Sequence, residues 1–271
     1  MLESYLVRGL KAGLVAGVAL GLFVALLANP MIAAAEGLAG EGGGHSHADG
    51  GHADGGSGGH HAGEGGHSHG GDASGVLDVV PAPLISVVGG VFWGLLLGVV
   101  AFGLAFYFLE PAIPGTGATK SAVAAAVGFV TVSGAPWLVL PPQPPGVEQA
   151  LSVDARLPIY AGMMLAGLTA CLLAGYTYNR LRDDGRARAL AGAAVPFALL
   201  VGLAIALPTN ATTQSLPAAF VAAFRAQVLF GQLMVWGLLA GTHAWLADGD
   251  SDTTTTGPVD GIPSDPRPTS D

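Results

Sequence analysis

The chain has 271 residues, of which 51% are hydrophobic and 11% are charged, and its mean hydropathy is +0.56. A soluble domain carries about a quarter charged residues, so this composition excludes an ordinary soluble protein. The net charge of −9 argues against a nucleic-acid partner. The single cysteine, Cys171, excludes a disulfide framework.

Six apolar stretches follow one another along the chain, each close to the ~20 residues needed to cross a bilayer. The expected transmembrane helices are residues 9–29, 82–109, 121–140, 157–178, 189–207 and 219–246. The polar sequence PTNATTQSLP (208–217) separates the last two, because prolines bracket it and turn-forming residues fill it. The sequence therefore predicts an all-α, polytopic membrane bundle of about six transmembrane helices.

The first apolar stretch has two interpretations. Residues 1–29 form the first transmembrane helix, or residues 1–35 are a cleaved signal peptide with small residues in MIAAAEG at the cut. Small residues every four positions let two membrane helices pack closely. Such patterns occur in the first and second stretches, at Gly9, Gly13, Gly17 and Gly21 and at Gly90, Gly94 and Gly98. This match favours the retained helix.

The segment between the first two stretches, residues 30–81, is rich in glycine and holds seven of the eight histidines. Neutral imidazole binds borderline divalent metals such as cobalt, nickel and zinc. Because glycine leaves the backbone free, a disordered loop with several weak sites is expected, rather than one rigid site. The expected metal ligands are His45, His47, His52, His60, His61, His67 and His69. The alternative is a solvated polar loop without a metal function.

The positive charges predict the orientation of the bundle. Cationic residues gather in cytoplasmic loops of membrane proteins. If six helices alternate, one side receives Arg8, Lys11, Lys120 and four arginines: Arg180, Arg182, Arg186 and Arg188. Both termini are then cytoplasmic, the histidine-rich loop is outside, and residues 82–246 form the remaining five helices. Residues 247–271 lack apolar periodicity and are expected to be a disordered acidic cytoplasmic tail.

The last apolar stretch carries four polar or amphipathic residues on one face. Arg225, Gln232, Trp236 and His243 are separated by seven, four and seven residues, and at about 100° per residue they share one side of a helix. Polar residues inside a membrane are functional candidates. Gln232 and His243 are therefore candidate pathway residues, and the alternative is a stripe that only orients the helix. Arg225 is expected to be a structural anchor paired with an outer-loop carboxylate, Asp154 or Glu148.

Two further features concern ligands and catalysis. Met163 and Met164, in the fourth stretch, offer soft thioether ligands to a metal path, although methionine in an apolar helix more often packs. Glu110, at the end of the second stretch, is expected near Lys120.

Nucleotide-binding, hydrolase and metalloprotease motifs are absent from the sequence, which predicts a protein that is not an enzyme and has no cofactor apart from a metal cargo.

Two motifs carry a family resemblance: PWLVLPPQPPGVEQA after the third stretch and FRAQVLFGQLMVW in the last. With the order of the stretches, they resemble the CbtA family of cobalt transporter subunits. The matching positions are Pro141, Pro142, Pro144, Pro145, Gly146, Val147, Phe224, Arg225, Gly231, Gln232 and Trp236. The sequence departs from the pattern at Gln143, where asparagine is expected, and the family is usually described with five spans.

The resemblance implies import of cobalt for corrinoid (cobalamin) synthesis, together with a small single-span companion subunit, CbtB. The first functional hypothesis is a multi-pass cytoplasmic-membrane subunit for uptake of cobalt or a related divalent transition metal, with the histidine-rich loop capturing metal. The second is a membrane-anchored metal buffer or sensor that does not transport. Lipid and divalent metal ions are the expected partners, and the acidic bias is similar to that of proteins from salt-loving archaea.

Overall fold

The computed structural model describes residues 2–41, 81–145, 147–208, 210–213 and 216–255. Within these residues, six helical stretches are long and apolar enough to cross a membrane, which confirms the polytopic all-α prediction. The seven histidines predicted as metal ligands, and Gly146 of the proline-rich motif, lie outside the described residues.

The first two transmembrane helices each contain a π-helical segment, in which the helix accommodates an extra residue. The first consists of α1 (Leu2–Phe23), η1 (Val24–Ala28) and α2 (Asn29–Glu41), and the second of α4 (Ala82–Leu97), η2 (Gly98–Ala105) and α5 (Phe106–Leu109). The first helix therefore continues into the segment expected as loop from residue 30. Its extension includes the run Ala33–Ala35, and alanine is the strongest helix former.

The other four transmembrane helices follow in chain order. They are α6 (Ala118–Phe129) with η3 (Val130–Gly134) and α7 (Ala135–Trp137), then α8 (Val153–Leu181) with η4 (Arg182–Asp184), α9 (Arg186–Ala206) and α10 (Ala218–Thr255). The start of α8 is capped by Ser152, whose side chain accepts a hydrogen bond from the Ala155 amide. The helix α10 passes its expected end at residue 246, so residues 247–255, expected in the tail, are helical. Residues 256–271 lie outside the described residues.

Close packing of α1 against α4 explains the repeated glycines. A Cβ atom on Gly17 would lie 2.7 Å from the Gly90 carbonyl oxygen, a distance that real Cβ atoms essentially never show. Gly13 faces Gly94 in the same way, and Ala12 and Ala16 beside them are fully buried. The first helix is thus an integral layer of the bundle, which favours the retained helix over the cleaved signal peptide.

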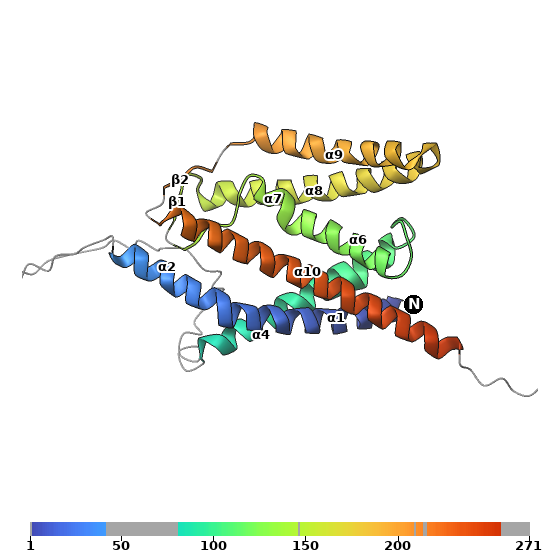
Figure 1. The fold of residues 1–271 in the computed structure, drawn as a ribbon, viewed down its shortest axis with the longest axis horizontal. Coiled ribbons are helices and arrows are strands. Elements are labelled where there is room, and N and C mark those ends of the chain that lie inside the picture. Colours follow the sequence, from blue (N-terminus) through green and yellow to red (C-terminus); the bar gives the residue numbers. More distant parts are fainter. Residues whose placement is uncertain (1, 42–80, 146, 209, 214–215, 256–271) are drawn as a thin grey trace, which may run out of the picture.

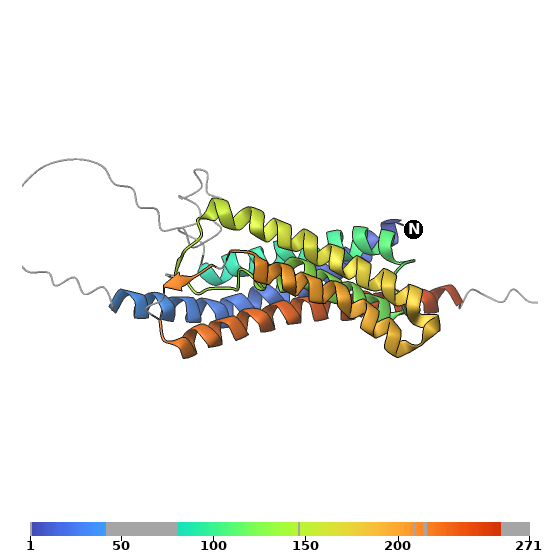
Figure 2. The ribbon, with the colours of Figure 1, turned by 90° about the horizontal axis from the view of Figure 1, so that it is seen from above.

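Neighbouring helices contact one another in the order α4, α1, α10, α6, α8, α9, and the second transmembrane helix also reaches α10 and α6 through η2 (Figure 1). The last helix, α10, lies between α1 and α6, and the third helix reaches α8 through η3 and α7. One core cluster fills the space between α1, η2, α6 and α10 and includes Ala12, Ala125, Phe102, Trp236 and Leu239. A second cluster joins the third helix to α8 and α9. Figure 2 shows all the helices running roughly along one direction.

The two ends of the bundle differ. At one, called the clasp end, β1 (Glu148–Gln149) pairs antiparallel with β2 (Thr212–Thr213). Asn210 reinforces this pair, because its side-chain amide donates to the Gln149 side chain at 2.8 Å and its oxygen accepts from the Leu151 amide at 3.2 Å. The loop after the third helix and the loop after the fifth therefore meet at one end, as six alternating helices require. These strands were not predicted from the sequence.

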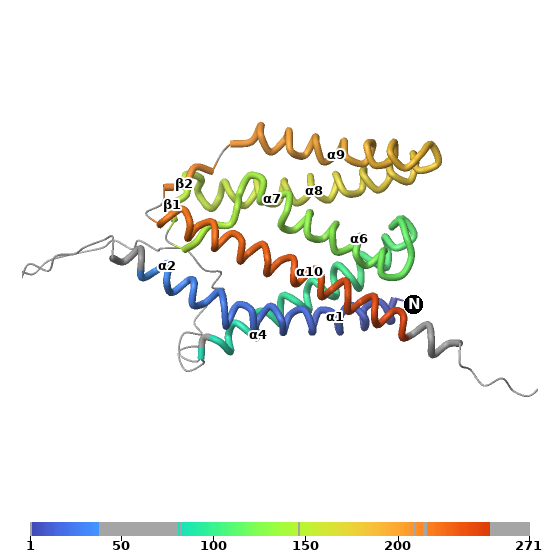
Figure 3. The backbone as a smooth tube through the Cα atoms, viewed as in Figure 1, coloured from blue at the N-terminus to red at the C-terminus, as the bar shows by residue number. Residues whose placement is uncertain are grey.

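The opposite end, called the N-terminal end, gathers the start of α1, the loop before α6, the turn between α8 and α9, and the end of α10 (Figures 1 and 3). The cationic residues used for the orientation prediction belong to these segments: Arg8, Lys11, Lys120, Arg180, Arg182, Arg186 and Arg188. The structure thus brings together the charges that alternation of six helices predicted on one side.

Candidate transport seam

The polar face of α10 contacts the third transmembrane helix and the proline-rich loop that follows it; this contact is called the seam. Its central part joins α10 to η3 and α6. The hydroxyl of Ser133 donates to the Gln232 side-chain oxygen at 3.2 Å. One turn along α10, Trp236 is 3% exposed and lies against Gly128, where a Cβ would overlap the indole ring. A glycine is therefore required at residue 128 for the two helices to approach.

Toward the N-terminal end, the seam contains a buried histidine. His243 is 1% exposed, its Nδ1 lies 3.0 Å from the Ser121 hydroxyl, and its ring packs on Phe102 and Phe106. Ser121 is 2% exposed. A serine hydroxyl can donate to or accept from an imidazole nitrogen, so this contact serves either tautomer of His243.

At the clasp end, the seam is closed by Arg225. Its Nε donates to the Pro142 carbonyl at 3.2 Å and its guanidinium also donates to the Gln143 side-chain oxygen at 3.0 Å. The prediction that Arg225 pairs with Asp154 or Glu148 was wrong, because its hydrogen bonds go to Pro142 and Gln143 instead. Proline cannot donate a backbone hydrogen bond, so the loop containing Pro141, Pro142, Pro144 and Pro145 does not form a helix and presents its carbonyl oxygens.

Three buried polar atoms along the third helix and α10 have no hydrogen-bond partner among the described residues: Thr131 Oγ1, Trp236 Nε1 and His243 Nε2. A buried polar group without a partner costs about 1–3 kcal/mol, so such atoms in a membrane bundle point to a use other than stability. An indole N–H can donate to a water ligand of a hydrated cation, and a neutral imidazole nitrogen can bind the cation directly.

Comparison with known proteins identifies the family. A family model described as "Probable cobalt transporter subunit (CbtA)" matches residues 2–248. The chain belongs to the CbtA family. No curated protein and no solved structure matches it. The matched range contains all six transmembrane helices and the whole seam. The resemblance inferred from the two motifs is thus confirmed, and the described residues of this CbtA-family chain contain six candidate spans rather than five.

The candidate sulfur ligands of this CbtA-family chain, Met163, Met164 and Cys171, lie on α8, outside the seam. Met163 is 1% exposed and packs in the apolar cluster between α7, α8 and α9, which also contains Ala135 and Leu200. Met164 is half-buried on the same helix, and Cys171 is buried. Within the described residues, no group of three or more His, Cys, Asp or Glu side chains could hold a metal. The structure therefore places Met163 in packing.

A second polar cluster ties the first three helices together at the N-terminal end. The Tyr5 hydroxyl donates to one Glu110 oxygen at 2.6 Å, and Lys120 donates to the other at 3.0 Å, which confirms the expected proximity of Glu110 and Lys120. The hydrogen bond from Tyr5, followed by that from Lys120, holds the pKa of Glu110 below its ordinary value. This carboxylate therefore stays ionised at neutral pH.

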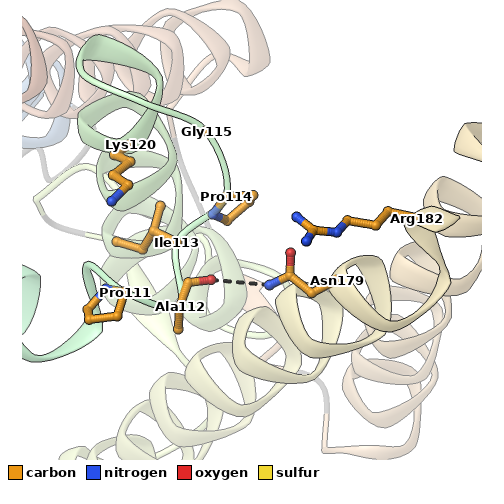
Figure 4. A pocket seen from close by; sticks show the side chains of 8 residues that line it. All are labelled: Pro111, Ala112, Ile113, Pro114, Gly115, Lys120, Asn179 and Arg182. Atoms are coloured by element: carbon orange, nitrogen blue, oxygen red, sulfur yellow. Dashed lines mark hydrogen bonds between the residues drawn. The ribbon is translucent and has the colours of Figure 1, made fainter.

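An open pocket of about 320 Å³ lies beside this cluster (Figure 4). The loop 111–115, Lys120, Asn179 and Arg182 line it, and the Asn179 amide donates to the Ala112 carbonyl at 3.2 Å. The pocket opens between the loop before α6 and the end of α8, so it lies apart from the seam.

The sequence pattern of α10 identified its side of the seam, but the residues that the third helix contributes were not predicted. Ser121, Gly128 and Ser133 supply the contacts from the third helix. The sequence did contain a signal, because Ser121, Thr131 and Ser133 interrupt this alanine- and valine-rich run with hydroxyl groups. Their pairing with α10 could not be read locally, since more than 90 residues separate the partners in sequence.

Proposed function

We propose that this protein is the membrane-embedded subunit of a cobalt uptake system in the cytoplasmic membrane. The observation that carries the proposal is the seam, a series of polar contacts along α10 that are partly buried at Arg225 and Gln232 and fully buried at His243. Polar side chains within a bilayer are costly and are retained where they serve a path or a site. Membership in a family of cobalt transporter subunits supplies the cargo.

The proposed orientation places the N-terminal end in the cytoplasm. The clustered Arg and Lys residues at that end support this orientation, because cationic loops remain on the cytoplasmic side. The histidine-rich segment follows α2 and precedes α4, which both meet it near the clasp end (Figure 1). At about 1.5 Å per residue the helical run Leu2–Glu41 spans about 60 Å, twice the ~30 Å hydrocarbon core. In this orientation the run delivers the histidine-rich segment to the outside.

We assign two stages to uptake. Residues 41–75 capture divalent metal through several weak imidazole sites and raise its concentration at the clasp end. Gln232 and His243 then contact the cargo along the seam, whereas Arg225, fixed by Gln143 and the Pro142 carbonyl, is an anchor at the clasp end. A small single-span companion subunit is the proposed protein partner, and co-purification from membranes tests it.

The alternative is an anchored buffer or sensor, in which the helices only hold the histidine-rich loop. The buried Ser121–His243 contact and the partly buried Ser133–Gln232 contact between the third helix and α10 favour transport, because an anchor needs no polar groups in its core. The two hypotheses separate on flux, since a buffer binds metal without moving it across the membrane.

The test measures metal accumulation in cells that have or lack the gene, across cobalt, nickel and zinc. A loop variant in which the seven histidines are replaced by serine keeps the length of the segment and removes its imidazoles. Uptake predicts gene-dependent cobalt accumulation, and capture predicts that the serine variant needs more external cobalt for half-maximal uptake but keeps its maximal rate. Accumulation that does not depend on the gene contradicts the proposal.

A further inference from the structure

The packing order of the six helices has an internal symmetry. In terms of chain position, the packing order α4, α1, α10, α6, α8, α9 is second, first, sixth, third, fourth, fifth (Figure 1). Exchanging the first, second and third helices with the fourth, fifth and sixth, respectively, gives the same order read from the other side of the bundle. Each half consists of a helix pair, α1 with α4 and α8 with α9, and a third helix. That third helix packs on the first helix of the other half: α10 on α1, and η3 with α7 on α8.

The two halves run in opposite directions through the bundle. Each contains three transmembrane helices, an odd number, so the second half begins at the end opposite to the first. Figure 3 shows this directly, because the chain starts at the N-terminal end whereas α8 starts at the clasp end. Two such halves are related by a pseudo-two-fold axis in the membrane plane, which passes through the crossing of the third helix and α10. The halves are not identical, since the described π-helical segments all belong to the first. The second helix also packs on α10 and α6 through η2, whereas its counterpart α9 packs mainly on α8.

We propose that the chain is an inverted repeat of three plus three helices, and that the seam on its axis works by alternating access. Carriers with inverted repeats bind cargo near the middle of the membrane at the repeat interface and rock one half against the other. In this protein that position holds the Ser133–Gln232 and Gly128–Trp236 contacts. The inference rests on the proposed function only in requiring that a cation crosses the seam.

The contacts at the two ends of the seam form a matched pair of locks. Near the start of α10, Arg225 binds Pro142 and Gln143 just beyond the far end of the third helix. In the first turn of α6, Ser121 binds His243 near the other end of α10. Each lock thus joins the beginning of one central helix to the far end of the other, as the pseudo-axis requires. Opening the Arg225 lock exposes the seam at the clasp end, and opening the Ser121 lock exposes it at the N-terminal end.

The experiment places one reporter cysteine between the centre and each lock. In a Cys171→Ala background, which removes the only native cysteine, Val228→Cys reports the clasp side and Leu239→Cys the N-terminal side. Val228 lies between Arg225 and Gln232 and Leu239 between Trp236 and His243. Each is three residues after one of these polar-face residues and four before the next, so it faces the seam. The rate of modification by a small water-soluble maleimide is measured on purified protein in detergent, where both ends are accessible.

Weakening one lock should open its own side and close the other. Gln143→Leu is expected to raise the rate at Val228→Cys and lower that at Leu239→Cys, and Ser121→Ala should do the reverse. The expected change is about fivefold to tenfold, the factor to which the loss of one hydrogen bond corresponds. Gln143→Glu and Ser121→Thr keep an oxygen at each lock and serve as matched controls that should not open their own side, and the carboxylate of Gln143→Glu should hold Arg225 at least as firmly. Cobalt added to the parent, in which both locks are intact, should also move the two rates in opposite directions, and this arm needs no lock variant.

If the labelling rates at Val228→Cys and Leu239→Cys rise together, the bundle has merely loosened and the inference is overturned. It is also overturned if neither rate changes in the lock variants or on addition of cobalt. The labelling of the lock variants uses no metal, so it is independent of the cargo. If labelling is reciprocal but cells with the gene do not accumulate cobalt, the proposed cargo is overturned and alternating access is supported. Cobalt accumulation with non-reciprocal labelling overturns alternating access and keeps the proposed function.

Discussion

Gly128→Ala should destabilise the bundle by wedging the seam open. The added methyl would overlap the Trp236 ring, with a third ring carbon 2.9 Å away, and the indole is only 3% exposed. Either the ring moves or α6 and α10 separate, and overpacking of this kind costs about 1–3 kcal/mol. Replacing a helical glycine by alanine returns up to about 1 kcal/mol. We expect a net loss of about 1–2 kcal/mol in the free energy of unfolding, measured in detergent.

The matched control is Gly237→Ala on α10, where an added Cβ meets no atom within 4 Å. Its stability should equal or exceed that of the parent. Trp236→Phe removes part of the ring that Gly128→Ala would strike, so the alanine should cost less in that background, giving a measurable coupling energy. If Gly128→Ala behaves like the control, or costs the same in both backgrounds, the packing of the seam described above is wrong.

Three further predictions concern the pathway, the N-terminal end and the topology. Gln232→Leu removes the partner of Ser133 from the middle of the seam, so the maximal rate of cobalt uptake should fall even at saturating metal, and an unchanged maximal rate would remove Gln232 from the path. The folded state lowers the pKa of Glu110, so its contribution to stability is full above its ordinary value of about 4.3 and is lost as pH falls through the lower, folded value. The stability difference between the parent and Glu110→Gln should therefore shrink on acidification, and a constant difference would contradict this. A membrane-impermeant thiol reagent applied outside cells should label Ser57→Cys and leave Ser251→Cys unmodified, whereas the reverse pattern would invert the proposed orientation.

Features set by local composition were predictable from the sequence. Hydropathy located the six described helices that could cross a bilayer, because that capacity depends only on the length and apolar composition of each segment. The spacing of Arg225, Gln232, Trp236 and His243 placed them on one face, since helical periodicity depends only on residue number. The glycine repeats likewise indicated a tight helix–helix contact, which α1 and α4 form.

Features that depend on distant segments were not predictable. Arg225 was expected to pair with a carboxylate, but it donates hydrogen bonds to the Pro142 carbonyl and the Gln143 side chain of the proline-rich loop. A guanidinium forms such hydrogen bonds wherever acceptors are presented, so charge matching alone gave the wrong partner. The packing order of the helices and the β1–β2 clasp are also long-range features, because neither leaves a periodic pattern in a single sequence.

Flux of cobalt across a membrane tests the central claim most directly. The purified protein is reconstituted into liposomes, with and without a co-purified companion, and the entry of labelled cobalt is followed against protein-free liposomes. The account predicts saturable entry that depends on the protein and that Gln232→Leu reduces at saturating cobalt. Cobalt that binds the proteoliposomes in proportion to the histidine-rich loop but does not enter the lumen, in either preparation, would contradict transport and support the anchored buffer.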